Sequence, residues 1–168
     1  MRNFSVVGVG HTGITVSNLE KSLHFYRDVL GFQASEQFHA GGATVEQFVG
    51  VQGAEIDIVF VRAPGHLIEL LCYRKPDDKR ISRLRPCDTG CLHLCLKVVS
   101  IDKVVEAMRG SDFEPIGVIQ TNHDGPAAGL RAVYTRDPDG VHIELIEDRP
   151  GVIFEELFFG TTGRAAET

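Results

Sequence analysis

The sequence has no long hydrophobic run and no excess of positive charge. Its longest uninterrupted apolar stretch is a few residues, whereas a membrane-spanning helix needs about 20. It opens without the basic region and apolar core of a secretory signal. Lys and Arg number 17 against 23 Asp and Glu, a net charge of -6. We therefore expect a cytoplasmic protein with neither a membrane nor a nucleic acid as partner.

The composition is that of an ordinary globular protein. Hydrophobic residues make up 43% of the 168 residues and charged residues 24%. These values do not fit a disordered or a fibrous chain. A chain of this length forms one domain, or two half-size units that share a core.

Cysteine is scarce, with four residues at positions 72, 87, 91 and 95. In a chain without a leader we expect reduced thiols. The last three recur at every fourth position around His93, which suggests a structural zinc site. Such sites usually pair their ligands on a tight turn, whereas the leucines at 92, 94 and 96 alternate as on a strand. The pattern therefore favours small core-filling cysteines.

The chain contains one long internal repeat, with copies at 6–73 and 88–147. A charged linker at 74–87 separates the copies, and an extension at 148–168 follows them. Each copy opens with a strand that contains a histidine and continues into an amphipathic helix. The first helix runs from Leu19 to Leu30 after an Asn18 or Ser17 cap and before Gly31, and the second follows Ser100 and ends at Gly110.

Strand-like segments follow each helix. The closing strands match best, because Gly65-His-Leu-Ile-Glu69-Leu-Leu aligns with Gly140-Val-His-Ile-Glu144-Leu-Ile. The other predicted strands are Gln33–Phe38, Val45–Val49, Ile56–Val61, Ile116–Thr121 and Arg131–Thr135. Two βαβββ modules predict an α+β protein whose two curved sheets form a trough.

Side-chain alternation along the strands predicts which residues face the trough. In the closing strands Ile68, Leu70 and Cys72, and likewise Val141, Ile143 and Leu145, should pack against helices. Glu69 and Glu144 then point away from the helices, as do His11 and His93 in the opening strands. Two imidazoles and two carboxylates suit one divalent ion, with zinc, nickel, cobalt, manganese and iron all acceptable.

Residues 6–147 resemble the vicinal oxygen chelate superfamily of glyoxalases, epimerases, extradiol dioxygenases and bleomycin-binding proteins. The resemblance rests on three motifs: His11-Thr-Gly-Ile-Thr-Val with Leu19-Glu-Lys-Ser-Leu-His-Phe-Tyr-Arg-Asp-Val-Leu-Gly-Phe32, His93-Leu-Cys-Leu-Lys-Val98, and Tyr134-Thr-Arg-Asp-Pro-Asp-Gly-Val-His-Ile-Glu-Leu145. It implies the same four metal positions, a small-molecule substrate and a homodimer. It leaves open whether the ligands meet within one chain or across two.

The number of ligands favours one reaction class. Iron oxygenases keep two histidines and one carboxylate, and a fourth protein ligand would obstruct oxygen binding. Four ligands favour an isomerase, epimerase or lyase of the glyoxalase I or methylmalonyl-CoA epimerase type, which moves a proton next to a carbonyl. Glu69 or Glu144 would be the base, and the resemblance makes Glu46 a third candidate, against a plain strand glutamate. An extradiol-type dioxygenase and a metal-free small-molecule binding protein remain alternatives.

Overall fold

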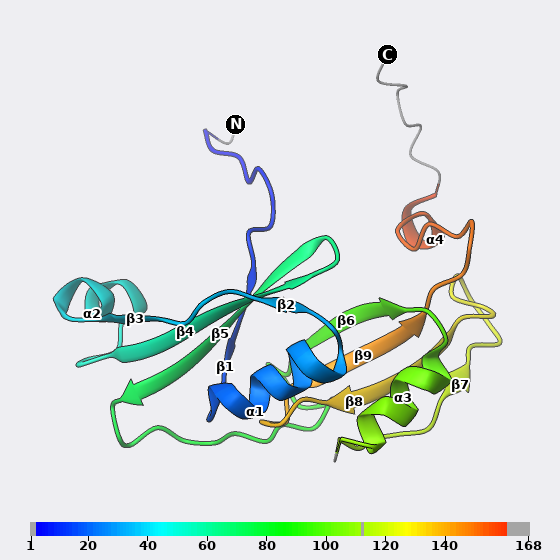
Figure 1. Ribbon diagram of the computed structural model, residues 1–168. Coiled ribbons are helices and arrows are strands. Elements are labelled where there is room, and N and C mark those ends of the chain that lie inside the picture. The colour runs from blue at the N-terminus through cyan, green and yellow to red at the C-terminus, as the bar shows by residue number, and fades with distance from the viewer. Residues whose placement is uncertain (1–2, 112, 161–168) are drawn as a thin grey trace. The chain divides into compact units, whose positions relative to one another are not determined.

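The computed structural model describes residues 3–111 and 113–160, which divide into two compact units (Figure 1). Unit 1 contains residues up to 83 together with 138–141, and unit 2 contains the rest. Each unit has its own sheet. In the described part of the chain, every helix is too short or too polar to cross a membrane.

The sheet of unit 1 is built around two long antiparallel strands, β4 (Glu55–Ala63) and β5 (His66–Lys75). The short strand β1 (Thr12–Thr15) lies parallel to β5. On the other edge, β4 pairs with β2 (Gln33–Ala34) and with β3 (Phe38–Gly41). The first strand of the unit therefore lies beside its last strand.

The sheet of unit 2 repeats this order. Strand β6 (His93–Val98) is parallel to β9 (His142–Glu147), and β9 is antiparallel to β8 (Arg131–Arg136). Strand β7 (Gln120–Thr121) completes the sheet beside β8. The predicted α+β class with two sheets is confirmed.

The first predicted helix forms as α1 (Leu19–Leu23), which continues into a wider π-helical segment, η1 (His24–Val29). The Asn18 side chain accepts a hydrogen bond from the Lys21 N–H at 3.0 Å, as a capping residue should. The wider turn of η1 buries two successive aromatic rings, Phe25 and Tyr26. With a regular period of 3.6 residues, only Tyr26 is predicted to lie on the buried face of the helix.

Alternate residues of the closing strands form the core of each unit. Ile68 and Leu70 on β5, and Ile143 and Leu145 on β9, are fully buried. The glutamates between them are only partly buried. The predicted faces are confirmed at these positions. Cys72 and Val141 are only partly buried, and on β9 the residues His142 and Ile146, on the face of Glu144, are buried as well.

Three local predictions are wrong. The segment Val45–Val49 is part of helix α2 (Ala43–Val49), and glycines with positive φ stand on both sides of it at 42 and 50. A short apolar run suits a strand or a helix equally, so periodicity could not separate them. The predicted strand Gln33–Phe38 forms as two strands, β2 and β3, and β3 continues past Phe38 to Gly41. The strand predicted at Ile116–Thr121 is reduced to β7.

Helix α3 (Ile101–Arg109) begins at the predicted residue, but Ser100 does not cap it through its side chain. The Ile101 N–H donates instead to the Glu147 carboxylate, at 3.1 Å. The C-terminal extension contains one helical turn, α4 (Glu156–Phe159). The remainder of the predicted extension, 161–168, lies outside the described residues.

The cysteines are not core residues, so that prediction is wrong. Cys72 and Cys91 are partly buried, Cys87 and Cys95 are exposed, and all four are free thiols. On β6, Cys95 lies on one face of the strand, and Leu94 and Leu96, which are half-buried, lie on the other. Leu92 precedes the strand and is exposed. Strand alternation places Cys95 on the same face as His93.

Candidate functional site

His11 and Glu69 form a close pair in unit 1. The β1–β5 register places Gly13 opposite Glu69, and His11 precedes Gly13 by two residues. Residues two apart on a strand share a face, so the imidazole and the carboxylate meet above the sheet. The His11 Nε2 atom lies 3.1 Å from Glu69 Oε2, and the two side chains are 45% and 17% exposed.

His93 and Glu144 repeat this arrangement in unit 2. The β6–β9 register places Cys95 opposite Glu144, and His93 precedes Cys95 by two residues. The His93 Nε2 atom lies 3.1 Å from Glu144 Oε2, with side-chain exposures of 45% and 21%. The two units therefore present the same two groups in the same register, at the same separation and at nearly the same exposure.

An aromatic ring stands beside each histidine. Phe60 is the β4 partner of Glu69, and its ring meets His11 edge-on with centroids 5.7 Å apart. Tyr134 is the β8 partner of Glu144, and its ring centroid lies 5.3 Å from that of His93. The Tyr134 hydroxyl lies 3.5 Å from His93 Nδ1, on the opposite side of the imidazole from Glu144.

The two pairs differ in their neighbours. Unit 1 has Gly13 and Phe60 where unit 2 has Cys95 and Tyr134. Desolvation and the adjacent Glu144 carboxylate raise the pKa of the Cys95 thiol to about 12. Burial and the same carboxylate also raise the pKa of Tyr134. Both groups therefore keep their protons at neutral pH when no cation is bound beside them.

Sequence reasoning did not identify Cys95 as a neighbour of the candidate site. The signal was available, because Cys95 follows His93 by two residues and so shares its face of β6. The regular spacing of Cys95 from the other cysteines is typical of a zinc site instead.

The four predicted ligands lie in the structure as two pairs, one in each unit. Within the ranges 3–111 and 113–160, no group of three or more His, Cys, Asp or Glu side chains is arranged to hold a metal ion. Within each pair, however, the two atoms are spaced as they would be if both bound the same ion. Two ligand atoms that are each roughly 2.0–2.2 Å from a zinc-type ion stand about 3 Å apart, as the imidazole nitrogen and carboxylate oxygen do here. That separation also suits a hydrogen bond, so the repetition of the pair is the stronger indication.

The contact that the structure shows for the Glu46 side chain is with a backbone group and not with either His–Glu pair. Glu46 is on α2 and not on a strand, and its carboxylate accepts a hydrogen bond from the Gly53 N–H at 3.0 Å. This contact ties α2 to the turn that follows it. A catalytic role for Glu46 stays a prediction without a described contact to support it.

Several curated proteins are similar to this chain. A 2-epi-5-epi-valiolone epimerase of Actinomyces sp is 32% identical over 155 residues, which cover 89% of this chain and 84% of the relative. The mitochondrial methylmalonyl-CoA epimerase of Dictyostelium discoideum is 27% identical, with 84% and 80% covered. The putative ring-cleaving dioxygenase MhqA of Bacillus subtilis is 25% identical, with 91% of this chain and 43% of the relative covered.

A solved structure and a family profile agree with the fold described above. The crystal structure of a glyoxalase family protein from Bacillus cereus superposes with a TM-score of 0.76 at 22% identity, covering 88% of this chain and 97% of that one. The profile of one superfamily matches residues 8–145, which include both His–Glu pairs. The chain belongs to the Glyoxalase/Bleomycin resistance protein/Dioxygenase superfamily.

Proposed function

We propose that the protein is a divalent-metal-dependent isomerase or epimerase, or a lyase of the same mechanism, which moves a proton next to a carbonyl of a small-molecule substrate. The observation that carries the proposal is the repeated His–Glu pair, at 3.1 Å in each unit. The similarity to two proteins named as epimerases supports this class of reaction.

His11, Glu69, His93 and Glu144 are the proposed ligands of one ion. Neutral imidazole nitrogen and carboxylate oxygen together suit zinc, nickel, cobalt, manganese or iron. When bound, the ion would supply Lewis-acid stabilisation of the enolate oxygen, without which a hydrogen next to a carbonyl is too weakly acidic to remove. We also propose that the protein acts as a homodimer.

The glutamates are the proposed proton-transfer groups. Glu69 and Glu144 are partly buried, and each faces an imidazole on one side and an aromatic ring on the other. A carboxylate held in this way can take the proton from one face of the substrate, while the second returns it from the other face. The roles of the two glutamates remain open in this proposal.

The proposal is tested by metal analysis followed by solvent exchange. Protein purified without chelators should contain a stoichiometric divalent ion. In D₂O it should incorporate deuterium next to the carbonyl of 2-epi-5-epi-valiolone or of methylmalonyl-CoA, the compounds in the relatives' names. Glu69→Gln and Glu144→Gln should slow exchange by roughly 100- to 10,000-fold. His123→Ala, on an exposed loop, serves as the control. Absence of a stoichiometric ion would overturn the proposal.

A ring-cleaving dioxygenase is the second candidate, and the similarity to MhqA favours it. That reaction would require ferrous iron and oxygen consumption, and it would tolerate Glu69→Gln because three protein ligands suffice. A metal-free binding protein would instead keep its ligand affinity in His11→Ala and Glu144→Ala. Glu69→Gln, His11→Ala and Glu144→Ala together therefore separate the three possible functions.

A further inference from the structure

Unit 1 contains an insertion that unit 2 lacks. Between β2 and β4 the chain forms β3 and α2, whereas β7 alone lies between α3 and β8 in the described part of unit 2. Strand β3 pairs with β4, with Phe38 opposite Ile58 and His39 opposite Asp57. Because side chains alternate, Phe38 lies on the face of the sheet that carries Phe60 and Glu69, and His39 lies on the other face.

Phe38 extends the aromatic neighbourhood of the His11–Glu69 pair. Its ring stacks on that of Phe60, with centroids 6.2 Å apart and planes 15° apart, and Phe60 in turn meets His11 edge-on. Phe38 is 46% exposed despite its size. Two stacked rings that reach from the sheet edge to a candidate ligand, with one ring open to solvent, form an apolar surface suited to a hydrocarbon group.

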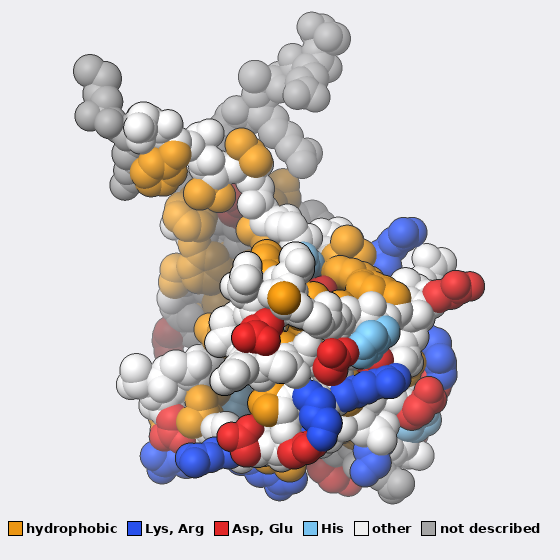
Figure 2. All heavy atoms as spheres, turned by 90° about the vertical axis from the view of Figure 1, so that its left-hand side faces the viewer, with side chains coloured by type: hydrophobic (Ala, Val, Ile, Leu, Met, Phe, Trp, Pro, Cys, Tyr) orange, Lys and Arg blue, Asp and Glu red, His pale blue; other side chains and the backbone are white. Residues whose placement is uncertain are grey.

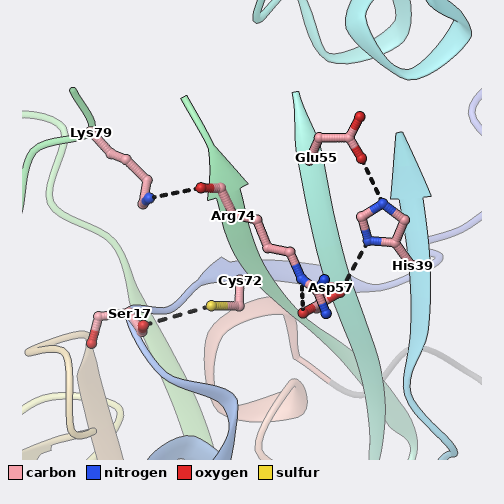
Figure 3. A network of polar contacts seen from close by, with 7 residues as sticks. All are labelled: Ser17, His39, Glu55, Asp57, Cys72, Arg74 and Lys79. Carbon is pink, nitrogen blue, oxygen red and sulfur yellow. Dashed lines mark hydrogen bonds and ion pairs between the residues drawn. The ribbon is translucent and has the colours of Figure 1, made fainter. Parts of the chain in front are cut away.

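A polar clamp on the opposite face fixes β3 to β4 (Figure 3). His39 Nε2 lies 2.6 Å from Glu55 Oε2, and His39 Nδ1 lies 3.1 Å from Asp57 Oδ1. The Arg74 guanidinium donates to the other oxygen of Asp57 at 2.6 Å. A neutral imidazole has one N–H, so only the protonated ring donates to both carboxylates. Figure 2, viewed from the side where α2 and β3 lie in Figure 1, shows acidic, basic and histidine side chains intermixed there.

We propose that Phe38 and Phe60 form an apolar subsite beside the His11–Glu69 pair that takes the hydrocarbon part of the substrate, and that His39 is the positioning residue that holds Phe38 there. The inference rests on the proposed function, because it assigns one end of the substrate to the metal site. It adds one feature of the substrate: an apolar group beside the atoms that the metal site would hold.

The charged groups that face His39 set the pH range of the clamp. Glu55 and Asp57 approach it from β4, and Arg74 approaches from β5. The charged residue of α2 is Glu46, whose carboxylate is engaged by the Gly53 N–H. Hydrogen bonds to Asp57 and Glu55 raise the pKa of His39 against the opposing effects of desolvation and of Arg74. The protonated ring, and with it the closed clamp, therefore persists to higher pH than in an ordinary histidine, and the clamp opens as pH rises through the His39 titration.

Two hydroxamates test the subsite directly. Acetohydroxamic and benzohydroxamic acid present the same chelating oxygens but carry a methyl and a phenyl group. By titration calorimetry on metal-loaded protein, the wild type should bind benzohydroxamate about tenfold more tightly. Phe38→Ala should reduce this preference to about twofold and leave the acetohydroxamate Kd unchanged. Phe48→Ala removes a ring of α2 that is 88% exposed, and it should keep the wild-type preference.

The positioning role of His39 has its own readout. The benzohydroxamate preference should fall as pH rises through the His39 titration in the wild type, and His39→Gln should show a small preference that does not vary with pH. His39→Lys, which restores a cation between the two carboxylates, should recover part of the preference at neutral pH.

The outcomes separate this inference from the proposed function. If neither hydroxamate binds any form of the protein, the metal site and the subsite both fall. If both bind and the preference is the same in wild type and Phe38→Ala, the subsite alone is wrong. A preference in the wild type that does not change with pH overturns the role of His39.

Discussion

His11 and His93 reach their glutamates through backbone register and not through long flexible side chains. In each sheet the glutamate is paired with a residue of the first strand, and the histidine lies two residues before that partner. Because the first and last strands are parallel neighbours, this register brings the imidazole next to the carboxylate. Strand geometry holds such positions to within a fraction of a residue spacing. Motif and alternation therefore predict the face on which each of the four side chains lies, whereas the pairing of each histidine with its glutamate comes from the strand register.

His39 could not be predicted in the same way, because its partners come from a strand 16 and 18 positions away. No repeat counterpart marks the β3 insertion, and a histidine among glycines is typical of a loop. The contacts of His39 depend on the pairing of β3 with β4, which is a tertiary feature that no local sequence pattern indicates.

A pH-dependent contribution to stability follows from the clamp. The raised pKa of His39 means that its contribution is complete below the ordinary histidine value of about 6.5 and is lost as pH rises through the folded-state pKa. The difference in unfolding free energy between wild type and His39→Gln should therefore shrink from pH 6 to pH 9, as measured by urea denaturation. His123→Gln provides the control on an exposed loop. A difference that is constant across this range would contradict the proposed clamp.

At the scale of elements, helix α3 is attached to its sheet by ionic contacts at its first turn. Glu147 on β9 accepts from the Ile101 N–H and from Arg131 on β8, while both terminal nitrogens of Arg131 donate to Asp102 at 2.8 and 3.0 Å. These contacts take the place of the side-chain cap predicted from Ser100. Capping propensity is local, so the sequence could not reveal that a residue 46 positions away occupies the role.

Loss of Glu147 should therefore destabilise the protein more than loss of Asp102. Glu147→Ala leaves the first N–H of α3 without its acceptor and removes one of the two carboxylates that bind Arg131, which we expect to lower the unfolding free energy by roughly 1–3 kcal/mol. Asp102→Ala removes an exposed ion pair, which solvent screens, and should lower the unfolding free energy less. Chemical denaturation of both variants tests this order, and equal losses would show that Glu147 does not support the helix.

At the scale of the whole molecule, duplication made most of the fold predictable. The order of strands, one helix and the buried faces appear in each copy, so each copy supports the assignment of the other. The departures fall where the copies differ: the β3–α2 insertion, the π-helical turn and the cysteines. A short apolar run, a change in helical period and a thiol on the open face of a strand have no repeat to identify them.

The duplication also leads to a prediction about metal stoichiometry. If all four residues bind one ion, as proposed, the protein should contain one ion per chain. Either His11→Ala or His93→Ala leaves three of the four ligands and should weaken the binding of that same ion. The loss of thermal stabilisation by metal in the double variant should differ from the sum of the two single losses, since residues of one site do not act independently. Atomic absorption and thermal unfolding with and without added metal measure both quantities. Two ions per chain, with one lost in each single variant, would show that the pairs bind independently and would remove the four-ligand site from which the reaction is inferred.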